Sequence, residues 1–241
     1  LWCPEEEGEW APGAATRWWL YQSLGSLERA LSEKGSRLVI RRTKDSAAEL
    51  RKLIKESGAT AVYWSRRYEP LIIARDQLIK QNLRDAGIEA RSFNAALLVE
   101  PWDIQNNSGK PFQVFTPYWR KVSATLDLPK PLATPARIPT PPTWPVSTEL
   151  DALKLLPKIH WYSGMQEAWR PGERGAMQHL GRFLDDSVAN YGETRNLPAQ
   201  TGTSRLSPHL HFGEISPRQI WHTAAKWRGS QFMAEIGWRE F

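Results

Sequence analysis

A hydroxyl-rich segment near the end of this 241-residue sequence is the first place where residue types and spacing could do chemistry. The segment Thr203-Ser-Arg-Leu-Ser207 comes directly before Pro208, a residue that favours the first turn of a helix. Free amides at a helix start and a nearby cation favour a bound anion, which predicts a phosphate site that includes Arg205. A capped helix start without any ligand produces the same pattern, so this alternative stays open.

A second segment brings a carboxylate, an indole and a guanidinium together. Glu235, Trp238 and Arg239 are spaced so that all three lie on one face of a helix. An unstacked nucleotide can be held by an aromatic surface for stacking, a group that bonds the base edge and a cation for its phosphate. These side chains supply all three, although an ordinary Glu–Arg ion pair beside a packed Trp is the alternative.

The elements that must position these segments begin with alternating helical and strand patterns. Apolar spacing predicts helices over residues 18–31, 47–57 and 71–85, and short apolar runs predict strands over 37–41, 61–64 and 88–93. Strands joined by helices form a parallel sheet covered on both faces, so we predict a doubly wound α/β fold. Leu1-Trp-Cys3 is typical of the end of a strand, which predicts that the first strand of the sheet is missing.

A proline-rich stretch between Leu128 and Val146 separates this pattern from the rest of the chain. Proline removes backbone donors and fixes φ, which excludes a regular helix and predicts a semi-rigid linker. We therefore predict an α/β domain over 1–125, a linker over 126–172 and the truncated beginning of an all-helical domain over 173–241.

The last part of the chain carries helical signals. Its apolar stripe consists of Met177, Leu180, Phe183, Leu184 and Val188 and leads to Tyr191. Ser207 and Ser216 each precede a proline, which predicts two capped helix starts, and Gln219 would complete a capping box with Ser216. His209 and His211 are two residues apart on a helix and point to different faces, so no metal site is predicted.

The composition, with 41% hydrophobic and 24% charged residues, is that of a globular protein. No apolar run is long enough to span a bilayer, and no export signal is visible, so we predict a cytoplasmic protein without a membrane partner. Cys3 is the only cysteine, which excludes an internal disulfide. A formal charge of +6 is compatible with a polyanionic partner, and the 13 tryptophans could stack on bases or simply pack in the core.

The ordered set of Tyr191, Thr203-Ser-Arg-Leu-Ser207 and Glu235…Trp238-Arg239 resembles the DNA photolyase/cryptochrome family. The resemblance covers essentially the whole chain. Leu1-Trp-Cys-Pro-Glu-Glu-Glu-Gly-Glu-Trp10, Arg17-Trp-Trp-Leu20 and Phe93-Asn94 to Glu100-Pro-Trp102 are similar to plant cryptochromes and to the bacterial photolyases nearest to them. It implies an antenna-type α/β domain followed by a helical domain that binds flavin adenine dinucleotide (FAD).

The resemblance also implies roles for individual residues. FAD would be contacted by Tyr191, Thr203, Ser204, Arg205, Leu206, Ser207 and Phe232, the last at a position where many photolyases carry Trp. Damaged DNA would be contacted by Arg195, Glu235, Trp238 and Arg239, with Glu235 bonding the dimer and Trp238 packing against it. Glu69 would contact an antenna pigment, methenyltetrahydrofolate or another chromophore.

The function implied by the resemblance is light-driven repair by a monomer, in which reduced FAD donates an electron that splits cyclobutane pyrimidine dimers in DNA. A cryptochrome photoreceptor with the same fold and flavin is one alternative, although Trp238 favours the photolyase. A basic nucleic-acid-binding protein without catalysis is another. The rest of the flavin pocket and the electron-donor chain would lie beyond Phe241, so we expect a fragment that holds flavin poorly and is inactive by itself.

Overall fold

The computed structural model describes all residues from 1 to 241, and they form two compact units. Unit 1 comprises residues 1–93 and 134–172, and unit 2 comprises residues 94–133 and 173–241. These units differ from the predicted division after residues 125 and 172. Residues 94–125 belong to the same unit as the C-terminal helices, and residues 134–172 belong to the same unit as the N-terminal segment. The three-part domain division itself stays a prediction.

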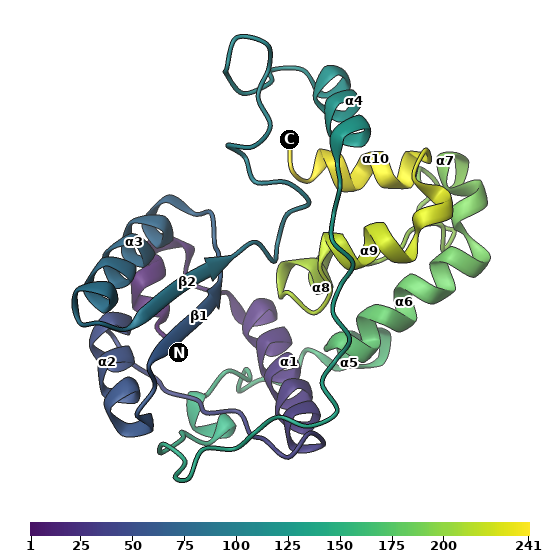
Figure 1. The fold of residues 1–241 in the computed structure, drawn as a ribbon. Helices are drawn as coiled ribbons and strands as arrows, with labels where there is room; N and C mark the ends of the chain where they lie inside the picture. The colour runs from purple at the N-terminus through teal and green to yellow at the C-terminus, as the bar shows by residue number, and fades with distance from the viewer. The chain divides into compact units, whose positions relative to one another are not determined.

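Unit 1 is built around a two-stranded parallel sheet (Figure 1). Its elements are η1 (Pro4–Trp10), α1 (Ala14–Ser32), α2 (Ser46–Ser57), β1 (Ala61–Ser65), α3 (Pro70–Asp85), β2 (Glu89–Phe93), η2 (Leu150–Leu153) and α5 (Ser163–Ala168). β1 pairs with β2 from Ala61↔Glu89 to Ser65↔Phe93, and α3 connects the two strands. The three predicted helices and the strands at 61–64 and 88–93 are confirmed, with ends that differ by no more than four residues.

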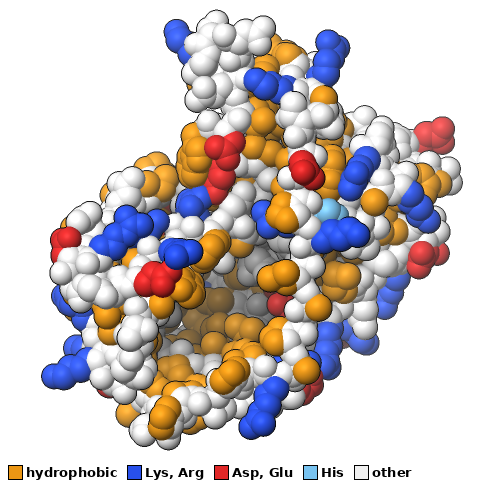
Figure 2. All heavy atoms as spheres, in the orientation of Figure 1, with side chains coloured by type: hydrophobic (Ala, Val, Ile, Leu, Met, Phe, Trp, Pro, Cys, Tyr) orange, Lys and Arg blue, Asp and Glu red, His pale blue; other side chains and the backbone are white.

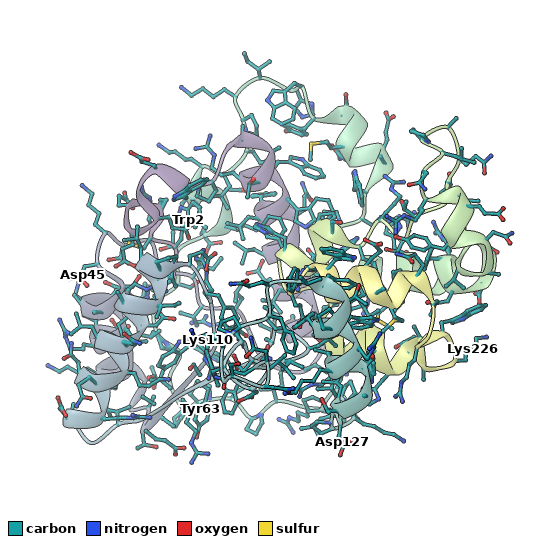
Figure 3. All side chains as sticks on the ribbon, turned by 90° about the horizontal axis from the view of Figure 1, so that it is seen from above. Trp2, Asp45, Tyr63, Lys110, Asp127 and Lys226 are labelled. Carbon is teal, nitrogen blue, oxygen red and sulfur yellow. The ribbon has the colours of Figure 1, made fainter.

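The helices α2 and α3 cover the sheet with the apolar faces that their sequences predict. Ile79 and Leu83 of α3 are buried together with Ala90 of β2, and Leu50 and Ile54 of α2 pack against them. Asp45 caps α2 by accepting a hydrogen bond at 2.8 Å from the amide of Ala48; Asp45 and Tyr63 on β1 are labelled in Figure 3. Gly58 ends α2 with a φ of 65°, a conformation that a side chain disfavours, as the predicted helix stop requires.

The predicted strand over 37–41 is wrong. Trp2 makes a single parallel bridge just after this segment, with Arg42, and its amide donates to the carbonyl of Arg41 at 2.8 Å. The amide of Ile40 donates instead to Ser147 Oγ at 2.9 Å, and Thr148 N donates to the Ile40 carbonyl at 2.8 Å. The loop at Ser147 and Thr148 thus takes up both backbone hydrogen bonds of Ile40, so residues 37–41 form no continuous ladder of hydrogen bonds with a neighbouring strand. The sheet therefore has two strands.

No helix or strand forms between residues 126 and 149, which confirms that the proline-rich stretch lacks regular structure. Its second half, which belongs to unit 1, is held by a side chain, since Arg37 donates to the Pro145 carbonyl at 2.8 Å and lies over the ring of Trp144. None of the helices in the chain combines the length and apolar composition that crossing a membrane requires.

Unit 2 is helical. Its elements are α4 (Phe115–Thr125), α6 (Glu173–Asp186), η3 (Val188–Asn190), α7 (Tyr191–Thr194), α8 (Ser207–His211), α9 (Pro217–Thr223), η4 (Ala225–Trp227) and α10 (Gln231–Trp238). Asp127 follows α4 and Lys226 lies in η4 (Figure 3). Leu180, Phe183 and Val188 of the predicted stripe are buried in its core, whereas Met177, at 44% exposure, faces solvent.

Only one of the two predicted caps forms. Ser216 Oγ accepts a hydrogen bond from Gln219 N at 3.2 Å, and Gln219 Oε1 accepts one from Ser216 N at 2.8 Å, which confirms the capping box. Ser207 caps nothing, because the residue before α8 is Leu206 in a helical conformation. A capping side chain must start from an extended backbone, so Ser207 already lies inside the helix.

Candidate functional site

Helices α7 and α10 bring two predicted DNA-contacting residues together. The guanidinium of Arg195, the residue after α7, donates through Nη1 to Glu235 Oε1 on α10. Gln231 Nε2 donates to the same carboxylate oxygen at 2.8 Å. Both charged side chains are 29% exposed, so the ion pair is partly exposed to solvent.

Tyr191, a predicted flavin contact, lies next to this pair. The Arg195 guanidinium is 5.7 Å from the centre of the Tyr191 ring. Partial burial, and then the charge of Glu235, raise the pKa of the Tyr191 hydroxyl. The tyrosine therefore stays protonated at neutral pH and can donate a hydrogen bond.

Tyr191 also joins two further predicted flavin contacts in one apolar cluster. Its ring meets Phe183 and Phe232 edge to face, with centroids 5.5 and 5.7 Å apart. Phe232 is 2% exposed, and Leu206 is buried in the same core. These residues form one continuous packed group, in which Phe232 and Leu206 serve as core side chains of unit 2.

The turn over 203–207 keeps its hydroxyls available. The side chains of Thr203, Ser204 and Ser207 make no hydrogen bond within the chain, and Thr203 and Ser207 are exposed. Arg205 has a φ of 54°, a conformation that costs a non-glycine residue on the order of 1 kcal/mol and that is common at ligand sites. The helix that follows has only five residues, so its dipole adds less to anion binding than the sequence predicts.

Gly202 fixes this turn against α7. A Cβ at Gly202 would lie 2.6 Å from Thr194 Cβ and 2.7 Å from the Thr194 carbonyl oxygen, so only glycine allows the approach. Because Thr194 immediately precedes Arg195, the turn and the ion pair are held by the same short helix.

The remaining members of the predicted trio contact different elements. Trp238 is 50% exposed, and its ring stacks on Phe115 of α4 with centroids 3.8 Å apart and an interplanar angle of 10°. Arg239 Nη1 donates to the carbonyl of Ala96 at 2.6 Å. Glu235, Trp238 and Arg239 thus lie on one side of α10, as predicted, but each has a separate partner. Hydrophobic side chains are visible over α4 and α10 in Figure 2, and Lys and Arg side chains over α6 and α7.

Two residues that the sequence analysis missed dock α10. Glu240 accepts hydrogen bonds from the amides of Leu98 at 2.6 Å and Val99 at 3.3 Å. Burial raises the pKa of the Glu240 carboxyl to about 7, although both amides and Arg239 act in the opposite direction. Gly237 packs against the ring of Trp119, where a Cβ would lie 2.4 Å from Cε3. The aromatic spacing of Phe115, Tyr118 and Trp119 was a signal that α4 has such a partner.

Glu69, the predicted antenna contact, lies in unit 1 just before α3. Its Oε1 accepts a hydrogen bond at 2.8 Å from Arg67 Nη2, and Arg67 Nη1 donates to Glu7 at the same distance. Burial opposes ionisation of Glu69, but the hydrogen bond from Arg67 outweighs it with other contacts and lowers the pKa. No other predicted site residue lies in this unit, and the antenna role stays a prediction.

Comparison with known proteins identifies relatives of the whole chain. The sequence model described as DNA photolyase matches residues 1–140. The chain is 43% identical over 237 residues to a deoxyribodipyrimidine photo-lyase of Agrobacterium fabrum, with 95% of this chain and 49% of the relative covered. It is 35% identical over 230 residues to Cryptochrome-1 of Arabidopsis thaliana, with 92% and 33% covered.

Solved structures agree with these relatives. A bacterial class III photolyase from Agrobacterium tumefaciens superposes with a TM-score of 0.91 at 42% identity, with 95% of this chain and 49% of that chain covered. An archaeal photolyase from Sulfolobus tokodaii, solved with two FAD molecules, gives a TM-score of 0.74 at 26% identity, with 95% and 47% covered. The chain thus spans about half the length of these photolyases, and its N-terminal part has the fold of the photolyase N-terminal domain.

Proposed function

This chain belongs to the DNA photolyase family, and on that basis we propose that it acts as a deoxyribodipyrimidine photolyase. Its substrate would be DNA that contains cyclobutane pyrimidine dimers, and the reaction would be a light-driven cleavage of carbon–carbon bonds. The observation that carries the proposal is the arrangement at α10, where a half-exposed indole and a carboxylate lie one helical turn apart and the Arg195 guanidinium after α7 pairs with that carboxylate. A flipped dimer needs these three groups for stacking, base-edge bonding and phosphate contact.

We further propose that the turn over 203–207 and Tyr191 contact FAD. The hydroxyls of Thr203, Ser204 and Ser207 are uncommitted within the chain, and Arg205 supplies a cation, so the donor set fits a dinucleotide with two phosphates. When bound, FAD supplies the light absorption and the electron that open the cyclobutane ring. The residues of this chain would orient the cofactor and hold the DNA.

The remaining expectations complete this proposal. The two-stranded sheet would belong to a doubly wound α/β domain that carries an antenna pigment near Glu69, and residues 173–241 would begin the helical FAD-binding domain. We keep the expectation that the protein is a cytoplasmic monomer.

The proposal is tested by a repair assay. The protein is expressed at its full natural length, supplied with FAD, reduced, and mixed with oligonucleotides that contain a single thymine dimer. We expect bound FAD and restoration of intact thymines under blue light and none in the dark. Retention of FAD without any light-dependent repair would exclude the photolyase activity.

Trp238→Ala tests the lesion-binding residue. Loss of base stacking is expected to weaken dimer binding by about 1–3 kcal/mol and leave FAD binding unchanged. Trp238→Phe retains a stacking ring and should lose less. Trp10, which is 83% exposed in unit 1, provides the matched control, and Trp10→Ala should change neither property. The assignment is wrong if Trp238→Ala releases FAD and keeps its affinity for dimers.

A cryptochrome is the second candidate, because the chain is 35% identical to Cryptochrome-1 of Arabidopsis thaliana. Such a protein would share the fold and the flavin and would respond to light without repairing DNA. The same assay separates the two functions, since a cryptochrome would show flavin photoreduction and no loss of dimers.

A further inference from the structure

The ion pair between Arg195 and Glu235 joins the two charged groups that the proposed function assigns to DNA. Arg195 would contact a phosphate, and Glu235 would bond the edge of a flipped base. In this structure each group neutralises the other, and the only further hydrogen bond to Glu235 comes from Gln231 at 2.8 Å. Neither charge is therefore available to a ligand until the pair separates.

We propose that this ion pair is a specificity latch that discriminates against undamaged DNA. The inference rests on the proposed function and adds a second role for Glu235, which is to mask Arg195 in the absence of a lesion. An undamaged double strand offers phosphates, but base pairing and stacking keep its Watson–Crick edges occupied. If Arg195 moves to a phosphate of such a strand, the Glu235 carboxylate loses its cation and faces the negative charge of the backbone.

A flipped dinucleotide changes this balance because it offers both partners at once. Its phosphate replaces the carboxylate at Arg195, and an N–H group on its base edge replaces the guanidinium at Glu235. The latch therefore opens without leaving a charged group unpaired. Glu235 thus lowers the affinity for the wrong ligand as well as raising the affinity for the right one.

The geometry allows the pair to open. Both side chains are 29% exposed, and ion pairs at such positions are weak enough for a ligand to break. The centre of the Tyr191 ring lies 5.7 Å from the Arg195 guanidinium, so a cation–π contact can stabilise Arg195 after the pair separates. Trp238, one helical turn after Glu235, is half exposed and positions a stacked base near the released carboxylate.

The test compares two substitutions that each remove one negative charge near Arg195. Glu235→Gln removes the masking carboxylate and keeps a similar shape. Glu193→Gln is the matched control, because Glu193 is an exposed residue of α7 that makes no ion pair. Binding is measured by fluorescence anisotropy at several salt concentrations with undamaged and dimer-containing double strands, on protein prepared as for the repair assay.

For Glu235→Gln we expect the affinity for undamaged strands to rise about two- to five-fold, because the free Arg195 gains a phosphate contact. The slope of log K against log salt should steepen by about 0.9, the change for one additional phosphate on double-stranded DNA. The preference for dimers should fall. Glu193→Gln should leave the slope unchanged.

Equal salt slopes for Glu235→Gln and Glu193→Gln would overturn the latch and leave the proposed function unaffected. Arg195→Gln provides a second measurement that does not depend on Glu235→Gln remaining folded. A masked Arg195 predicts that Arg195→Gln weakens dimer binding and hardly affects undamaged strands, and an equal loss on both would also overturn the latch. Absence of any dimer preference in the unaltered protein would instead overturn the proposed function, and the latch with it.

Discussion

Gly237→Ala is the substitution that probes the docking of α10 most directly. A Cβ at this position would lie 2.4, 2.6 and 3.0 Å from three atoms of the Trp119 ring. The ring cannot bend away as the end of a flexible side chain would, because it is also stacked near Phe115. Either α10 or α4 must therefore move.

The magnitude follows from two opposing effects. Overpacking of this kind costs about 1–3 kcal/mol of unfolding free energy, and alanine recovers about 1 kcal/mol through its higher helix propensity. We expect a net loss of about 0–2 kcal/mol, the cost of overpacking less the gain in helix propensity. Gly181, within α6, is the matched control because a Cβ added there would meet no atom within 4 Å, so Gly181→Ala should stabilise by about 0.5–1 kcal/mol.

The assay is urea unfolding followed by tryptophan fluorescence, with dimer binding as a second readout. Displacement of α10 should separate Trp238 from Phe115, so Gly237→Ala should weaken dimer binding and Gly181→Ala should not. If both variants are stabilised equally, the close contact between Gly237 and Trp119 does not exist in solution and the docking argument fails.

Two further predictions concern the helices that carry the site. The pKa of Glu240 is raised from 4.5 to about 7, so between these pH values its carboxyl binds more protons in the folded state than in the unfolded state. Its contribution to the free energy of unfolding is therefore fully present below pH 4.5 and is lost as the pH rises through 7. We expect the unfolding free energy to fall by at most about 3 kcal/mol across this range. Glu240→Gln should abolish this fall, and an identical pH profile in the variant would contradict the raised pKa of Glu240. Ser216→Ala should cost about 1 kcal/mol by removing the cap of α9, whereas Ser216→Asp should retain most of that stability in the same unfolding assay.

Local patterns in the sequence predicted most of the elements, because they depend on neighbouring residues. Apolar spacing placed α2 and α3, and the pair of Ser216 and Gln219 marked the start of α9. The strand over 37–41 failed because its backbone is satisfied by Ser147 and Thr148, more than a hundred residues away, which no local pattern records. Ser207 failed as a cap because the conformation of the residue before it decides where the helix begins.

The sequence identified the types of residue in the candidate site better than their contacts. It placed Glu235, Trp238 and Arg239 on one side of a helix, and the structure agrees. It could not predict that Arg195, forty residues before Glu235, forms its ion pair, or that Ala96 accepts a hydrogen bond from Arg239. Such contacts arise where segments far apart in the sequence pack together, and a single sequence does not show which segments will be neighbours.

The end of α10 combines two kinds of residue, and this combination explains how a surface site can be held firmly. Gly237 and Glu240 face the rest of unit 2 and bind it through a close ring contact and two amide hydrogen bonds. Glu235, two residues before Gly237, and Trp238, directly after it, are partly exposed, so a ligand can reach them. Because docking and ligand-facing residues alternate along one helix, a shift of one would move the other. The stacking surface and the latch are therefore positioned by side chains that never touch the DNA, and substitutions at Gly237 or Glu240 should alter lesion binding without removing any group that contacts it.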